Sequence, residues 1–105
     1  MTLSQLCTLL KSTSLPVTYR AWPVGNAPEL PWIAYMVVGS SNFSADGKVY
    51  FPINDVIVEL YHKTPETGES DVLEAAFDSA GLFWQKTINY IDDEGVWQTL
   101  YHIQI

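Results

Sequence analysis

The chain has 105 residues, 48% of them hydrophobic, which fits one folded domain with a single modest core. Its formal net charge is −7, from 12 acidic and 5 basic side chains, and the basic residues form no cluster that could grip nucleic acid. The single cysteine, Cys7, excludes an internal disulfide, and no apolar run approaches the ~20 residues that span a bilayer. The first residues lack the basic region of a signal peptide, so we expect a soluble, cytoplasmic protein that does not enter a membrane.

The first elements are a helix and a short strand. In residues 2–13, Thr2 can cap a helix whose apolar stripe is formed by Leu3, Leu6, Leu9 and Leu10, and Pro16 ends it. Residues 16–22 alternate between two faces and predict a strand, which we place at the sheet edge because it is short.

The middle of the chain predicts two longer strands. After a proline-rich loop at 23–31, residues 32–38 are almost continuously apolar, as in a strand covered by the core on one face and by a partner on the other. Residues 39–48 are polar and end in Asp46-Gly47, which predicts a loop with a tight turn. Residues 49–63 are rich in β-formers and predict a strand that is bent, or lies at an edge, near Pro52.

The last third predicts a helix and a hairpin. Residues 64–70 are a polar connection, and the helix at 71–80 has an apolar stripe formed by Val72, Leu73, Ala76, Phe77 and Ala80. Strands at 82–91 and 96–105 are joined by a turn at 92–95. The order α-β-β-β-α-β-β predicts an α+β two-layer sandwich, with two helices packed on one face of a mostly antiparallel sheet, in one domain over 1–105.

The predicted packing names a core. If both helices cover the same sheet face, their stripes should meet the strand at 49–63. We therefore expect four helical side chains to be buried against strand residues such as Val58 and Leu60: Leu6, Leu10, Leu73 and Phe77.

A search for chemistry finds no catalytic set. His62, His102 and Cys7 do not have metal-ligand spacing, and each histidine is expected to face solvent or an interface from a strand. No nucleophile elbow, phosphate loop or dinucleotide-binding glycine pattern occurs. The acidic run Asp92-Asp93-Glu94 is too short for a calcium loop and indicates a solvated turn. We therefore expect no metal, no cofactor and no enzymatic activity.

Several segments together resemble the tail completion, or tail terminator, proteins of long non-contractile-tailed bacteriophages. The match follows the order of these segments over nearly the whole chain: the opening helix leading into Leu15-Pro16-Val17-Thr18-Tyr19, then Leu30-Pro31-Trp32-Ile33-Ala34-Tyr35, Asn42 to Tyr50, Val58-Glu59-Leu60-Tyr61-His62-Lys63 before an acidic helix, a strand ending in Tyr90-Ile91, and Trp97 to Ile103. The chain departs from the family pattern at Pro52 and at residues 64–70.

The resemblance implies a minor structural protein of the virion tail, made in the host bacterial cytoplasm. Such subunits form a homo-oligomeric ring, usually a hexamer, that ends tail-tube growth and joins the tail to the head. The implied partners are further copies of the chain, the tail tube protein and the head–tail connector protein, while DNA passes through the lumen without specific binding.

Five residues are candidates for contacts in such a ring. Phe43 is a lone aromatic residue in the polar segment 39–48, which also holds Asp46, and it either contacts a neighbouring subunit or folds back onto its own core. Asp92, Asp93 and Glu94 are expected to line the lumen or its rim, where they would repel DNA. Two other classes stay open: a ferredoxin-like regulatory module that binds a small ligand, and a small enzyme.

Overall fold

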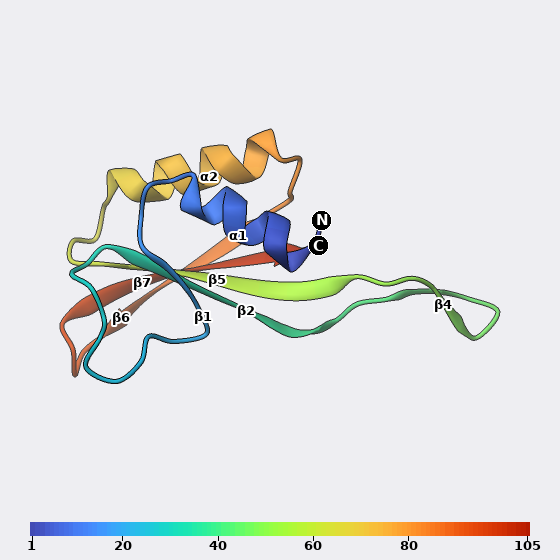
Figure 1. The fold of residues 1–105 in the computed structure, drawn as a ribbon, viewed down its shortest axis with the longest axis horizontal. Coiled ribbons are helices and arrows are strands. Elements are labelled where there is room, and N and C mark those ends of the chain that lie inside the picture. Colours follow the sequence, from blue (N-terminus) through green and yellow to red (C-terminus); the bar gives the residue numbers. More distant parts are fainter.

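Two helices cover one face of a five-stranded sheet in the computed structural model of this chain, which describes residues 1–105 except for the side chain of Tyr50 (Figure 1). The elements in chain order are α1 (Leu3–Lys11), β1 (Val17–Tyr19), β2 (Trp32–Ser40), β3 (Phe43–Ala45), β4 (Lys48–Phe51), β5 (Asn54–His62), α2 (Gly68–Ser79), β6 (Gln85–Ile91) and β7 (Val96–Gln104). The predicted α+β two-layer fold is confirmed, with five strands between the helices where three were expected.

The sheet has the strand order β1-β2-β5-β7-β6, and only the β1–β2 pair is parallel. The short β1 lies at one edge, as predicted, and β6 forms the other. In the central strands Val58 is paired with Tyr35 on one side and with Tyr101 on the other. Because side chains alternate along each strand, this row and every second row beside it point toward the helices.

Both helices begin at threonine caps. Thr2 is the N-cap of α1, as predicted, and it forms a capping box with Gln5. Helix α2 starts at Gly68 after the N-cap Thr67, three residues before the predicted start, because the segment 64–70 holds a capping threonine that its polar composition concealed. Gly81, with a φ of 71°, follows the end of α2 in the left-handed conformation that glycine favours.

The predicted core is confirmed. All four helical side chains named from the sequence have no exposed surface: Leu6, Leu10, Leu73 and Phe77. They pack in one cluster with Val58 and Leu60. Val72 was assigned to the apolar stripe of α2, but it is 51% exposed, because it lies on the side of the helix that faces away from the sheet.

The segment between β2 and β5 is not the predicted loop. Strands β3 and β4 pair with each other in a separate two-stranded ribbon that extends far beyond the main sheet (Figure 1). Pro52 does break the long predicted strand, since β4 ends at Phe51 and β5 begins at Asn54. We call residues 41–53 the arm and the remainder of the fold the body.

No helix among the described residues has the length and apolar character needed to cross a membrane.

Candidate functional site

The arm exposes large apolar side chains. Phe43, Val49 and Phe51 are 60%, 59% and 61% exposed. Phe43 and Phe51 are cross-strand partners and share one face of the ribbon, whereas Val49 is paired with Ser44 across a register shift and lies on the other face. A monomer leaves these apolar side chains largely in water, which makes the arm a candidate contact surface.

The arm is anchored firmly at its base. Asp55 accepts hydrogen bonds from Ser41 Oγ at 2.7 Å and from Gln104 Nε2 at 2.9 Å, and these bonds lower the pKa of its carboxyl group. The side chain of Asn42 accepts a bond from the Ile53 amide at 3.0 Å. At the tip, Asp46 and Gly47 both have positive φ, as a tight hairpin turn requires. The arm therefore has a defined direction even though no helix packs on it.

An aromatic pocket lies at the opposite end of the sheet from the arm. Trp22, in the loop after β1, meets Trp32 edge to face with ring centroids 5.9 Å apart, and Trp32 lies 4.4 Å from Tyr61. The cavity beside these rings has a volume of about 510 Å³. Its lining consists of Arg20, Ala21, Trp22, Ala27, Leu30, Trp32, Ala34, Tyr61, Ile91, Glu94 and Val96.

The polar groups of the aromatic pocket are not all satisfied. The Trp22 indole N–H is buried and has no hydrogen-bond partner among the described residues. Tyr61 Oη donates to Glu59 at 2.8 Å, and burial together with that carboxylate raises the pKa of Tyr61 to about 12. Arg20 and Glu94, both exposed, supply one positive and one negative charge to the lining. The pocket can therefore receive an apolar segment that carries a hydrogen-bond acceptor.

The structure separates the predicted contact residues into two groups. Phe43 and Asp46 belong to the arm, whereas the acidic run of residues 92–94 lies in the β6–β7 turn at the other end of the molecule (Figure 1). The alternative that Phe43 folds back onto its own core is wrong, since it is 60% exposed. The aromatic pocket was not predicted, because its rings come from three separate segments: the β2–β5 pairing places Trp32 opposite Tyr61, and Trp22 reaches Trp32 from the loop after β1.

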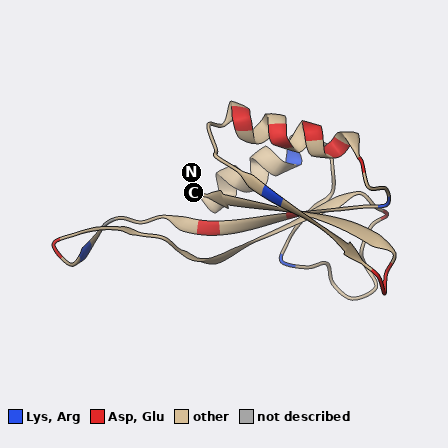
Figure 2. Cartoon of the chain, turned by 180° about the vertical axis from the view of Figure 1, so that it is seen from behind, with Lys and Arg blue, Asp and Glu red and all other residues tan. Residues whose placement is uncertain are grey.

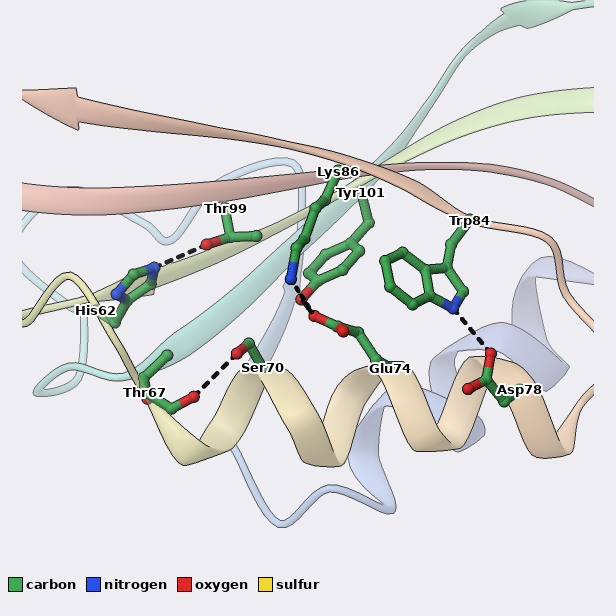
Figure 3. Close-up of polar contacts among 9 residues, drawn as sticks. All are labelled: His62, Thr67, Ser70, Glu74, Asp78, Trp84, Lys86, Thr99 and Tyr101. Atoms are coloured by element: carbon green, nitrogen blue, oxygen red, sulfur yellow. Dashed lines mark hydrogen bonds and ion pairs between the residues drawn. The ribbon is translucent and has the colours of Figure 1, made fainter.

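His62 was predicted to face solvent or an interface, and this prediction is wrong. The residue is buried, with 2% of its surface exposed, and its ring lies between Thr99 and the turn before α2 (Figure 3). Its Nδ1 lies 2.6 Å from the Thr64 carbonyl oxygen and its Nε2 lies 2.8 Å from Thr99 Oγ1. A carbonyl can only accept, so Nδ1 donates to Thr64, and in the neutral ring Nε2 accepts from Thr99. The turn before α2 folds over His62 and removes it from solvent. Both ring nitrogens therefore have structural partners.

A second set of polar contacts ties α2 to the sheet (Figure 3). Tyr101 Oη donates to Glu74 Oε2 at 2.6 Å, and Lys86 Nζ donates to the same oxygen at 2.9 Å. Burial, followed by the Glu74 carboxylate, raises the pKa of Tyr101. Trp84 Nε1 donates to Asp78 Oδ1 at 2.9 Å one turn further along the helix. These contacts fix the position of α2 on β6 and β7.

Other candidate groups do not converge. His102 is exposed on the sheet face away from the helices, as predicted, and Cys7 is partly buried against the core. Within the described part of the chain, no three His, Cys, Asp or Glu side chains are grouped so that they could hold a metal ion.

Charge is distributed unevenly over the molecule (Figure 2). Acidic residues are distributed along α2, which has Glu69 and Asp71 in its first turn and no basic residue in its last turn. The end of the arm carries one acidic and one basic residue, Asp46 and Lys48. The tip is therefore locally neutral on a chain whose net charge is −7.

Comparison with protein-family models, with curated proteins and with solved structures found no match to this chain. Function must therefore be inferred from the geometry of the arm, the aromatic pocket and the charged turns.

Proposed function

We propose that this chain is a structural virion assembly protein whose copies form a ring at the head-proximal end of a phage tail. The ring ends growth of the tail tube and joins the tail to the head connector. Its partners are further copies of the chain, the tube protein and the connector protein, and DNA passes through the lumen without specific binding.

The observation that carries the proposal is the apolar face of the arm. Phe43 and Phe51 are each about 60% exposed on a ribbon that projects from a well-packed body. Large exposed aromatic side chains are costly in water and are enriched at protein interfaces. An anchored arm at one end of a small body is suited to reaching a neighbouring subunit or a tube protein.

The acidic turn supports the passage of DNA. Asp92, Asp93 and Glu94 are all exposed at the end of the sheet. If several copies direct this turn toward a channel, their carboxylates repel the phosphate backbone and prevent adhesion. The same charges on an outer surface would serve solubility alone.

Electron microscopy of the protein with tail tubes tests the proposal. Tubes polymerised from the cognate tube protein should stop growing when this chain is added, and their ends should carry ring-shaped density. Tubes of unchanged length distribution with bare ends at saturating protein would contradict the proposal.

A ligand-binding regulatory module is the second candidate, and one cleft favours it. The cleft at the base of the arm has a volume of about 580 Å³, within the range of ligand pockets. Asp55, Gln85 and His102 place polar groups around its apolar lining of Ile57 and Leu82. Native mass spectrometry separates the candidates: a ring of identical subunits favours tail assembly, and a monomer or dimer with a bound small molecule favours the module.

A further inference from the structure

The arm and the aromatic pocket lie at opposite ends of the same molecule, and each presents apolar surface to solvent. The arm offers an apolar face formed by the exposed rings of Phe43 and Phe51. The pocket offers a cavity of about 510 Å³ walled by Trp22 and Trp32. A second copy of the chain brings the two together.

We propose that the arm of one copy inserts its apolar face into the aromatic pocket of the next copy, so that chains join head to tail. The inference rests on the self-association in the proposed function and names the surfaces that perform it. It does not depend on the presence of a phage tail.

Each of the two surfaces carries one positive and one negative charge. The tip of the arm carries Asp46 and Lys48 on either side of Gly47, and the pocket lining carries Arg20 and Glu94. An inserted arm places each charge of the tip near an opposite charge of the pocket. Because a rim pair of this kind contributes mainly to orientation, it sets the direction in which the arm enters.

The pocket also holds a donor that lacks an acceptor. The buried Trp22 N–H has no partner among the described residues, and leaving such a group unpaired is unfavourable. Both strands of the arm have an outer edge with backbone carbonyl groups, because β3 and β4 pair only with each other. A carbonyl at that edge can accept the indole N–H when the arm is seated.

The contact is small, which predicts weak association of free subunits. Rings that are about 60% exposed offer on the order of 100–150 Å² each for burial, far below the ~800 Å² per partner of a standard interface. Each chain has one arm and one pocket, so a contact leaves a free arm and a free pocket. The series closes into a ring if the rotation between neighbours divides a full turn.

Mixing two complementary variants tests the proposal by sedimentation velocity. The arm variant, Phe43→Ser with Phe51→Ser, keeps its pocket, and the pocket variant, Ala27→Trp, keeps its arm. Each variant alone should be monomeric. An equimolar mixture should form dimers and nothing larger, because one contact uses the only intact arm and the only intact pocket of the pair. Phe83→Ser is the matched control, since it removes a 79% exposed aromatic side chain from the body and should associate like the wild type.

The proposal would be overturned if the wild type stayed monomeric at about 1 mM, a concentration at which even a weak contact is populated. It would also be overturned if either the arm variant or the pocket variant associated like the wild type. A mixture of the two folded variants that forms no dimer would overturn it as well. If Ala27→Trp is unfolded by circular dichroism, a charge swap between the arm and the pocket replaces the mixing test. Glu94→Lys alone should weaken association about two- to fivefold, and Lys48→Glu in the same chain should restore it; no restoration would also count against the arm–pocket contact.

Failure of this inference is distinguishable from failure of the proposed function. If the mixture forms dimers but the wild type does not cap tail tubes, the arm–pocket contact stands and the tail role falls. If the arm variant still caps tubes with a ring, the tail role stands and the contact falls.

Discussion

The body buries its apolar side chains and the arm exposes them, although both are built from the same kinds of residue. In the body, Phe77 and Tyr101 have no exposed surface, and their ring centroids lie 5.4 Å apart. On the arm, Phe43 and Phe51 face each other across two strands and remain about 60% exposed. The difference lies in the position of the rings: Phe77 and Tyr101 belong to the core between α2 and the sheet, whereas Phe43 and Phe51 lie on a separate two-stranded ribbon.

This difference divides stability from assembly. Full burial of a side chain such as Phe77 contributes about 1.5–3 kcal/mol to folding, whereas a largely exposed ring contributes little. Apolar groups that a monomer leaves in water are available for association. Substitutions in the body should therefore change the free energy of unfolding, and substitutions on the arm should change association.

Phe77→Ala should have the largest effect on folding, a loss of about 3–5 kcal/mol in the free energy of unfolding, because it opens a cavity under α2. Phe51→Ala on the arm should cost below about 0.5 kcal/mol. Urea unfolding followed by circular dichroism measures both. Similar losses for the two variants would remove the distinction between body and arm.

Tyr101→Phe should have a smaller effect in the body. It deletes the hydroxyl that donates to Glu74 while the ring stays packed, which predicts a loss of about 1–2 kcal/mol. Tyr90→Phe, at a ring that is 48% exposed, is the matched control and should be close to neutral. A thermal melt that shows no difference between the two variants would indicate that Glu74 is adequately satisfied by Lys86 alone.

Acid should loosen the base of the arm before it unfolds the body. The pKa of Asp55 is lowered from 3.8 by hydrogen bonds from Ser41 and Gln104, so the ionised form is favoured in the folded state. The resulting stabilisation is complete above pH 3.8 and is lost as the pH falls through the lower folded value.

Amide NMR signals at the base of the arm, around Ser41 and Asp55, should therefore shift over that window. Asp55→Asn should remove the transition, because the side chain no longer ionises. If the variant keeps the same acid transition, another group controls the base of the arm.

Reversing the charge of the acidic turn should have the smallest effect on folding. Asp92→Lys with Asp93→Lys leaves Glu94 in the pocket lining and changes only exposed side chains, so the melting temperature should stay within about 2 °C of wild type. Assembled rings of the variant should retain DNA at low salt and release it at high salt. Normal DNA release at low salt would place these carboxylates on the outer surface.

The fold of the body was predictable because each element has a local signal. Leucines at helical spacing, the cap Thr2 and the turn at 92–95 fixed the main elements, and the chain order then limited their packing. The arm was missed because segment 39–48 is short and polar, so that its pairing depends on the turn at Gly47 and not on an apolar pattern.

The candidate site was predictable only in part. Phe43 stood out as an aromatic residue in a polar segment, which is a local feature. The pocket is not local, since the register of β2 with β5 places Trp32 opposite Tyr61 and Trp22 reaches Trp32 from the loop after β1. The burial of His62 likewise depends on the turn that leads into α2, which sequence alternation does not report.

Hydrogen–deuterium exchange at two protein concentrations tests the central distinction most directly. In dilute protein, amides of the arm should exchange rapidly while those of β5 and β7 are protected, because only the body is stable alone. At high concentration, protection should appear in residues 41–53 and in the loop around Trp22, with β5 and β7 unchanged. Equal exchange of the arm at both concentrations, with no change near Trp22, would contradict the account.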